Sequence, residues 1–172
     1  MKNVIGRYIK KTPKRYFEKV SKERKNKDFG VIYVKDEDIK LPKRSTKWSA
    51  GYDFFAPFNI SLKPNQSLAV PTGIRAFMQP DEVLKIYPRS GLGFKYFTRL
   101  ANTVGIIDAD YQNSDNEGHI FIKIRNEGDK ILSIKKGEAF AQGIFEKYLL
   151  VDGDSFNNGD NRNGGFGSTT EN

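Results

Sequence analysis

Two aspartates and a tyrosine, Asp108, Asp110 and Tyr111, follow directly behind the short apolar run VGII. A carboxylate at the end of such a run can act as a general base, belong to a metal-binding loop, or close a turn through hydrogen bonds to its own backbone. A calcium loop of the EF-hand type is excluded, because its sixth position would hold Asn113 instead of glycine and its twelfth His119 instead of glutamate. From these residues alone, a catalytic carboxylate and an ordinary turn both remain open.

A second segment, YPRSGLGFK, places Arg89 and Ser90 beside Gly91 and Gly93. Free backbone amides, a guanidinium and a hydroxyl can together bind an anion such as phosphate. The spacing matches neither a Walker A loop nor a dinucleotide fingerprint, whose third glycine position is occupied here by Tyr96. A phosphate-binding loop and a plain turn are both compatible with this composition.

Near the C-terminus, GGFGST (164–169) isolates Phe166 among glycines. A tail that closes over a nucleotide would use the glycines to approach phosphate and the ring to stack on a base, whereas a linker has a similar composition. His119 is the only histidine and the sequence has no cysteine. We therefore expect neither a zinc site nor a Ser-His-Asp triad.

The elements that must position these residues are mostly short strands. In a strand over HIFIKIR, Ile120, Ile122 and Ile124 would share one face. A helix is predicted only over TPKRYFEKVSKERK, with Thr12 as cap and Pro13 at its first position. The strands are predicted over VIYV (31–34), SLAVPTGIRAF (67–77), EVLKIYP (82–88), HIFIKIR (119–125), ILSI (131–134) and AFAQGIFEKY (139–148). Many short strands without long helices favour an antiparallel sandwich or barrel.

The chain of 172 residues is long enough for one domain with a core. Residues 1–47 carry sixteen Lys/Arg against six Asp/Glu, while the rest carries thirteen against fifteen. We expect residues 1–30 to form a solvated, partly helical basic arm, with attraction of nucleic acid or an anionic substrate as the alternative. Residues 152–172 are predicted to be a flexible tail from their Gly, Asn and Asp content. No apolar run suits a signal peptide or a bilayer span, so we expect a cytoplasmic protein.

Five segments, taken in order, resemble the five motifs of the trimeric dUTPase family. They are AGYDFFAP (50–57), PRSGLGFK (88–95), NTVGIIDADY (102–111), KKGEAFAQGIF (136–145) and RNGGFGST (162–169). The resemblance covers roughly residues 40–172, and it is far more specific than any single motif. The form GLGFK … NTVGIID … DNEGHI is similar to a branch common in Gram-positive bacteria and their phages.

The resemblance implies an all-β, jelly-roll-like subunit in a homotrimer whose active sites are each built from all three chains. Such enzymes hydrolyse dUTP to dUMP and pyrophosphate with Mg²⁺, which keeps uracil out of DNA and supplies dUMP for dTMP synthesis. By the same resemblance, Asp108 would orient and deprotonate the water that attacks the α-phosphorus. Asn102 and the backbone from Gly105 to Ile107 would bind the uracil edge. Tyr111 would lie under the deoxyribose and leave no room for a 2′-hydroxyl.

The first, second and fourth motifs imply the contacts to phosphate and metal. Arg89, Ser90 and Gly91 would hold the triphosphate, and Gln142 would contact a phosphate. Asp53 would support the Mg²⁺ site, through a water molecule. Magnesium suits this arrangement because it keeps several waters and bridges phosphates, so it needs few protein ligands.

The fifth motif implies four contacts from the tail. Arg162 would bind the γ-phosphate and Phe166 would stack over the uracil. Gly167 and Ser168 would contact the phosphates. The tail 152–172 is thus expected to close the active site.

The sequence departs from the family pattern in four places. The turn after Tyr111 is lengthened at 112–117, and Ala139 stands where arginine is common. Arg162 lies two residues before Gly164 instead of three, and Thr170 replaces a common glycine. Two alternatives to the hydrolase remain open: a dCTP deaminase-like enzyme of the same fold, and a nucleotide-sensing regulatory protein that uses the basic segment on nucleic acid or a protein partner.

Overall fold

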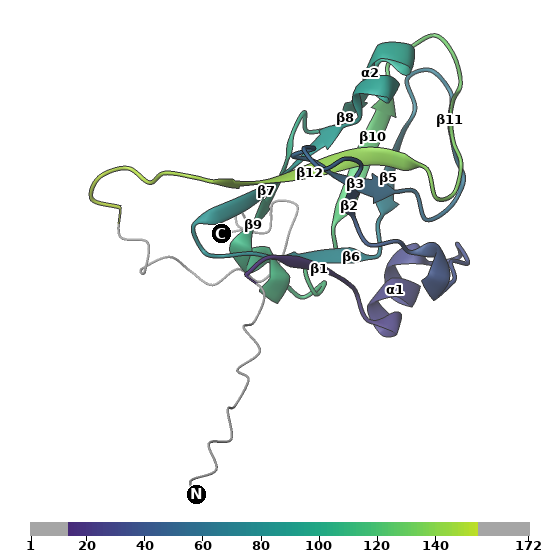
Figure 1. Cartoon of the computed structure of the whole chain (residues 1–172). Helices are drawn as coiled ribbons and strands as arrows, with labels where there is room; N and C mark the ends of the chain where they lie inside the picture. The colour runs from purple at the N-terminus through teal and green to yellow at the C-terminus, as the bar shows by residue number, and fades with distance from the viewer. Residues whose placement is uncertain (1–13, 155–172) are drawn as a thin grey trace, which may run out of the picture.

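The computed structural model describes residues 14–154, in which short antiparallel strands dominate (Figure 1). In chain order the elements are β1 (Tyr16–Lys19), α1 (Lys22–Phe29), the 3-10 helix η1 (Asp36–Asp38), β2 (Lys43–Arg44), β3 (Tyr52–Phe55), β4 (Ile60–Leu62), β5 (Ser67–Pro71), β6 (Ile74–Phe77), β7 (Glu82–Pro88), α2 (Ser90–Tyr96), β8 (Thr98–Leu100), β9 (Gly105–Asp108), the 3-10 helix η2 (Ala109–Asn113), β10 (Phe121–Asn126), β11 (Leu132–Ile134) and β12 (Ala139–Lys147). Within 14–154 no helix is long and apolar enough to cross a membrane.

The strands form a five-stranded sheet of order β2-β3-β12-β7-β9, a three-stranded sheet of order β5-β10-β8, and the pairs β1-β6 and β11-β4. Every pairing is antiparallel. One continuous apolar core takes side chains from all four sheets, for example Ile74, Leu84, Ile124 and Leu132. This is an all-β fold of the jelly-roll type, as the sequence predicts.

The predicted segments located six of the twelve strands, β5, β6, β7, β10, β11 and β12, although β5 and β6 were expected as one run (67–77). β7 has the same bounds as the predicted segment 82–88, and the isoleucines at 120, 122 and 124 are all buried. The strand predicted over VIYV (31–34) is wrong. These residues follow the turn at Gly30, whose φ is positive, and no neighbouring strand pairs with them. β-branched and aromatic composition suits a strand, but a strand forms only where a partner edge supplies its hydrogen bonds.

The helix predicted to start at Thr12 is also wrong in its first half. Thr12 and Pro13 lie outside the described residues, and Tyr16–Lys19 is the strand β1, antiparallel to β6. The rings of Tyr16 and Phe77 stack across this pair, with their centroids 4.4 Å apart. The helix begins only after Ser21, whose hydroxyl caps it by accepting the Arg24 amide proton at 3.0 Å.

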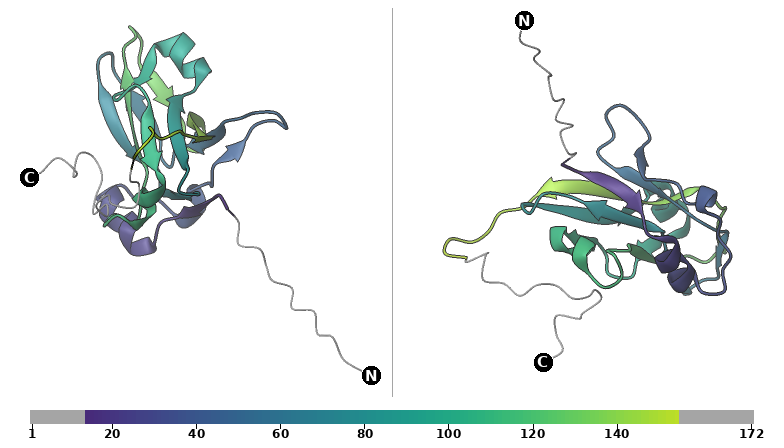
Figure 2. Two further views of the ribbon diagram at one scale, coloured as in Figure 1. Left: turned by 90° about the vertical axis from the view of Figure 1, so that its left-hand side faces the viewer. Right: turned by 90° about the horizontal axis from the view of Figure 1, so that it is seen from below.

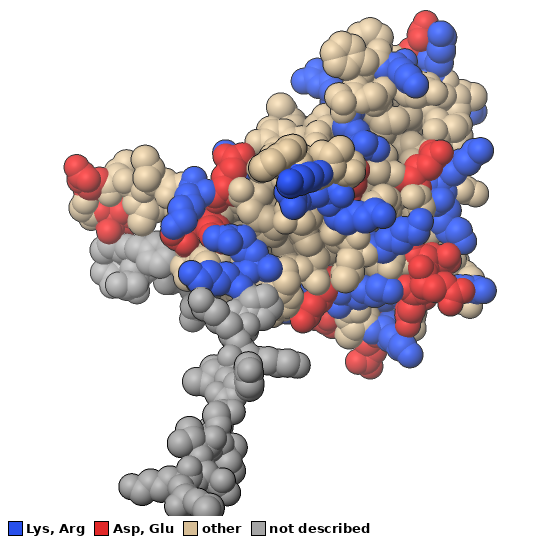
Figure 3. All heavy atoms as spheres, viewed as in Figure 1, with Lys and Arg blue, Asp and Glu red and all other residues tan. Residues whose placement is uncertain are grey.

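The described part of the basic N-terminal segment is folded against the sheets, so the expectation of a solvated arm is wrong for residues 14–30. Phe29 is buried in the core, and Arg15 Nε donates to the buried Glu82 carboxylate at 2.6 Å. Both views in Figure 2 show β1 and α1 along one end of the molecule, close to the turn that follows η2. Around α1 and η1, basic and acidic side chains alternate (Figure 3), and pairs such as Lys25–Asp36 neutralise part of the charge.

Candidate active site

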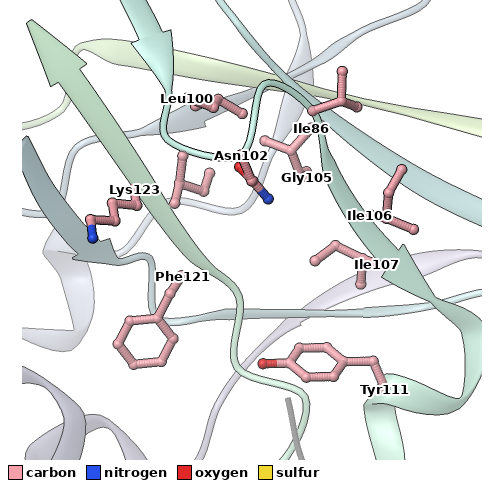
Figure 4. A pocket seen from close by; sticks show the side chains of 11 residues that line it. Ile86, Leu100, Asn102, Gly105, Ile106, Ile107, Tyr111, Phe121 and Lys123 are labelled. Atoms are coloured by element: carbon pink, nitrogen blue, oxygen red, sulfur yellow. The ribbon is translucent and has the colours of Figure 1, made fainter. Parts of the chain in front are cut away.

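A cavity of about 250 Å³ lies where β7, β9 and β10 meet the loop before β9 (Figure 4). Its walls include four residues predicted to bind substrate: Asn102, Gly105, Ile107 and Tyr111. The remaining lining residues are Ile86, Leu100, Val104, Ile106, Phe121, Ile122 and Lys123. An apolar cavity with a few polar groups is the usual form of a small-ligand site.

The tight loop 101–104 places Asn102 at one end of this cavity. The Ala101 amide donates to the Lys123 carbonyl at 2.8 Å, and Thr103 adopts a positive φ of 64°. Gly105 then lets β9 approach β7 closely, because an added Cβ there would lie 3.1 Å from the Ile86 Cβ. In Figure 4 the Asn102 amide points into the cavity, and the Phe121 and Tyr111 rings lie at the opposite end.

Asp108 ends β9 directly after the cavity residue Ile107 and pairs with Val83 of β7. Its side chain is half-buried, whereas that of Asp110 is exposed. Asp108 is not itself a lining residue but stands at the edge of the cavity, on the strand that forms one wall. A carboxylate in this position can act on a group bound at the mouth of the cavity.

Tyr111 is buried and its phenol is held by the turn that follows it. The hydroxyl donates to the His119 carbonyl at 3.0 Å and accepts from Asn116 Nδ2 at 2.8 Å. The lengthened segment 112–117 is therefore in direct contact with Tyr111.

Asp53, Arg89 and Gln142 form a second cluster, between β3, β12 and the start of α2. Arg89 Nε lies 3.3 Å from Asp53 Oδ1, and the Asp53 side chain is only 12% exposed. Gln142 lies opposite Asp53 in the β3–β12 pairing, and its Nε2 donates to the Pro88 carbonyl at 3.2 Å. One guanidinium and one amide are thus held side by side at the end of β7.

Ser90 and Gly91 open the helix α2, whereas the sequence suggested a glycine turn. Arg89 precedes this helix, and the amides of its first residues have no carbonyl four positions earlier inside it. The space beside Gly91 is open, since an added Cβ would meet no atom within 4 Å. The Leu92 and Gly93 amides donate to the Arg89 carbonyl, so the amides of Ser90 and Gly91, the Ser90 hydroxyl and the Arg89 guanidinium are the groups of this segment that could bind an anion.

Asp108 and Arg89 lie far apart within one chain, although Gly105 pairs with Ile86, three residues before Arg89. Asp108 is opposite Val83, near the start of β7, whereas Arg89 follows the last residue of that strand. Six residues of extended chain span on the order of 20 Å. The chain therefore carries two half-sites. The cavity half-site consists of Asn102, Gly105, Ile107, Asp108 and Tyr111. The phosphate half-site, named for its predicted ligand, consists of Asp53, Arg89, Ser90, Gly91 and Gln142.

Some predicted residues fall outside the described part of the chain, namely Arg162, Phe166, Gly167, Ser168 and Thr170. Ala139 begins β12 beside an irregularity in its pairing with β3. Within 14–154 no group of three or more His, Cys, Asp or Glu side chains could hold a metal ion. A metal at Asp53 would thus need its other ligands from phosphate and water, which is the arrangement that Mg²⁺ favours.

Sequence reasoning missed Phe121 and Lys123, which line the cavity. The signal was present, because both alternate with the buried face of β10 formed by Ile122 and Ile124. A large aromatic residue on the outward face of a strand indicates a contact beyond the core of its own sheet.

Comparison with known proteins gives a consistent result. A family model described as dUTPase matches residues 37–170. A deoxyuridine 5′-triphosphate nucleotidohydrolase of Lactococcus lactis is 47% identical over 140 residues, which cover 81% of this chain and 93% of the relative.

Solved structures agree with this assignment. A dUTPase of Streptococcus mutans superposes with a TM-score of 0.66 at 38% identity, covering 80% of this chain and 99% of that one. The structure of a mutant dUTPase from phage phi11 of S. aureus, which coordinates a structural Mg(II) ion, shares the fold with a TM-score of 0.59 at 20% identity, covering 72% of this chain and 93% of that one. By sequence and by fold, the chain belongs to the dUTPase family.

Proposed function

We propose that this chain hydrolyses dUTP to dUMP and pyrophosphate, which keeps uracil out of DNA and supplies dUMP for dTMP synthesis. The observation that carries the proposal is the cavity half-site, which gathers Asn102, Gly105, Ile107 and Tyr111 beside Asp108. These residues have the chemistry to bind a base edge, exclude a bulkier sugar and activate a water.

In this proposal the uracil enters the cavity with its polar edge toward the Asn102 amide and the backbone from Gly105 to Ile107. The side chains of Ile86 and Leu100 give the base an apolar environment. Tyr111 lies under the sugar, where a ribose 2′-hydroxyl would meet its ring. Sugar selection is then steric and is set by the position of one side chain.

Asp108 would act as the general base. It orients a water molecule and accepts its proton while the water oxygen bonds to the α-phosphorus and the bond from that phosphorus to the β-bridging oxygen breaks. The oxygen leaves with pyrophosphate. A positioned base typically contributes about 10²–10⁴-fold to the rate.

The separation of the half-sites supports a site shared between chains in a homotrimer. The α- and γ-phosphorus of one triphosphate are linked through only two bridging oxygens, far less than the roughly 20 Å of β7 between Asp108 and Arg89. Asp108 of one chain would therefore act with Arg89, Ser90, Gly91 and Gln142 of another. The apolar run after β12, in which Leu149 is 97% exposed, supplies surface that a trimer would bury.

Magnesium is the cofactor we propose, with Asp53 holding it through water and the triphosphate supplying the other ligands. When bound, the ion neutralises charge on the phosphate oxygens. The chain's own part is to orient the phosphates through Arg89, whose guanidinium the Asp53 carboxylate holds in place.

The remaining assignments concern the ends of the chain. We propose that residues 31–151, with the N-terminal elements packed on them, are the catalytic domain and that the tail 152–172 closes it. Arg162, Gly167 and Ser168 would then bind phosphates, and Phe166 would stack on the base. A cytoplasmic location suits an enzyme of the nucleotide pool, and nucleic-acid binding by the basic N-terminal residues is a possible addition.

Pyrophosphate release with Mg²⁺ and each deoxynucleoside triphosphate in turn tests the proposed activity. We expect release from dUTP and at most traces from the others. Ammonia release from dCTP would indicate the deaminase alternative, and binding of dUTP without turnover would indicate the regulatory one. Family membership favours neither alternative.

A further inference from the structure

The helix α1 is hydrogen-bonded to the turn that holds Tyr111. The Ser21 amide and hydroxyl donate to the two Glu117 carboxylate oxygens at 2.9 and 2.6 Å. About two helical turns further on, Asp28 Oδ2 lies 2.6 Å from His119 Nδ1. We call these bonds, Ser21 to Glu117 and Asp28 to His119, the α1–turn contact.

His119 is completely buried, and its protonation state follows from its partners. The Gly73 amide donates to His119 Nε2 at 2.8 Å, so Nε2 carries no proton. The ring proton is therefore on Nδ1 and is donated to Asp28. His119 is thus fixed from two sides, by α1 and by the corner between β5 and β6.

The same turn holds both ends of Tyr111. At the ring end, the phenol donates to the His119 carbonyl and accepts from Asn116. At the backbone end, Ser114 Oγ donates to the Tyr111 carbonyl, and Asn116 Oδ1 accepts from Ser114. Any shift of the turn 114–119 must therefore move the tyrosine that lines the cavity.

Gly118 shows how closely this turn packs on Tyr111. Its φ is +72°, and an added Cβ would lie 2.8 Å from the Gln112 Cα and 2.9 Å from the Tyr111 carbonyl oxygen. Next along the chain, the His119 ring packs against Phe121, with centroids 4.5 Å apart. Phe121 lines the cavity beside Tyr111, as Figure 4 shows.

The helix α1 lies outside the part of the chain that matches the family model, which begins at residue 37. The turn that α1 contacts, through Glu117 and His119, lies inside the matched part. A segment outside the family model therefore meets the turn that holds the residue proposed to exclude ribose.

We propose that α1 is a positioning element for sugar selection, with Asp28 and His119 as positioning residues that fix the Tyr111 ring in the cavity. The proposal rests on the hydrolysis of dUTP proposed above. A steric filter excludes one hydroxyl only if the ring cannot yield, and displacements of about 1 Å can change rates by about 10²-fold. Loss of the α1–turn contact should therefore relax discrimination between dUTP and UTP more than it lowers turnover of dUTP.

The test is the ratio of kcat/KM for dUTP to kcat/KM for UTP, measured by pyrophosphate release in the full-length protein. Asp28→Ala should lower this ratio by about tenfold. Asp28→Asn, which can still accept the His119 Nδ1 proton, should restore most of it. Glu23→Ala is the matched control, because it removes an exposed acidic residue from the same helix and should leave the ratio unchanged.

The ratio separates positioning from a merely structural role, because loss of folded protein lowers both rates equally. Should Asp28→Ala not fold, Ser21→Ala, which removes the hydroxyl that donates to Glu117 and caps α1, should still lower the ratio several-fold. A wild-type ratio in the folded variants, together with a lowered ratio in Tyr111→Ala, would overturn the positioning role and leave the dUTPase activity standing. No pyrophosphate release from dUTP by the wild type would instead refute the proposed function, and the positioning role with it.

Discussion

The cavity half-site and the phosphate half-site are built in opposite ways. In the first, Tyr111 is buried and hydrogen-bonded by its own turn, and the cavity walls belong to β7, β9 and β10. In the second, Arg89 remains 41% exposed and the space beside Gly91 is open. A single chain thus encloses the proposed pocket for base and sugar but leaves the proposed phosphate-binding surface open.

This difference suggests that one half-site selects the base and the sugar, whereas the other binds the phosphates. Selection of base and sugar depends on differences of one or two atoms and requires a rigid, preorganised site. Phosphate binding tolerates a site completed by a second chain and a tail, because charge acts over longer distances and closure excludes water. The following predictions test whether the two half-sites can be separated by mutation.

Asp108→Asn should have the largest effect, because it removes the proposed base without changing the size of the side chain. We expect kcat to fall by about 10²–10⁴-fold. Affinity for dUTP should change little, since the cavity residues are untouched. Single-turnover kinetics and calorimetry measure the two quantities, and near-wild-type turnover would disprove the role of Asp108.

Arg89→Ala should cost about 10²-fold in kcat/KM, through loss of one charged donor to the phosphates. The preference for dUTP over UTP should persist, because the cavity half-site is intact. A change in that preference would show that the half-sites are not independent. Gln142→Ala should cause a smaller loss of kcat/KM, because the Gln142 side chain is uncharged and already donates to the Pro88 carbonyl.

Mixing the Asp108→Asn and Arg89→Ala chains tests whether one active site uses two chains. In randomly mixed trimers, roughly a quarter of the sites would combine an intact Asp108 with an intact Arg89. Co-refolded protein should then regain about that share of wild-type activity, although each variant alone is nearly inactive. Mixtures that stay inactive would contradict the shared site.

Tyr111→Ala should lower the ratio of dUTP to UTP hydrolysis by roughly 10–100-fold, which is the usual limit for steric rejection of one hydroxyl. Base selection should survive, because Asn102 and the loop 101–104 keep their hydrogen bonds. Competition assays with dUTP, UTP and dCTP distinguish the two kinds of selection. An unchanged ratio would show that Tyr111 is not the filter.

The sequence predicted β5, β7, β10 and β12 of the two larger sheets, because their burial follows a pattern that is visible locally, but it did not predict the shorter strands β2, β3, β8 and β9. It failed for β1 and α1, where the outcome depends on distant partners. Tyr16–Lys19 became a strand because β6, almost 60 residues later, offers a free edge. VIYV (31–34) has a similar composition, but these residues do not pair with a strand edge.

The same limit applies to the site. Resemblance supplied the motif residues, and the structure brings several of them together in one cavity. His119 attracted attention only as an unlikely zinc ligand or triad member, because its partner Asp28 lies 91 positions away. A hydrogen bond over that separation leaves no periodic signal in one sequence, so the link between α1 and Tyr111 emerged only from the fold.

The smallest predicted effect concerns His119 and pH. Burial lowers the pKa of His119 below its usual value of about 6.5, although Asp28 opposes this and Arg24 adds to it. Because the unfolded chain then binds more protons, the stability that His119 contributes is complete above about pH 6.5 and is lost as the pH falls below it. The Tm should therefore decrease between pH 7.5 and 5.5 by roughly 2–4 °C for each kcal/mol lost. His119→Gln, which does not titrate, should show a flatter profile. Protonation adds a proton at His119 Nε2 and removes its bond from the Gly73 amide, so the dUTP to UTP ratio of the wild type should fall over the same pH range if that bond helps to hold the turn 114–119. Parallel Tm profiles for the two proteins would mean that groups other than His119 account for the acid sensitivity in this range.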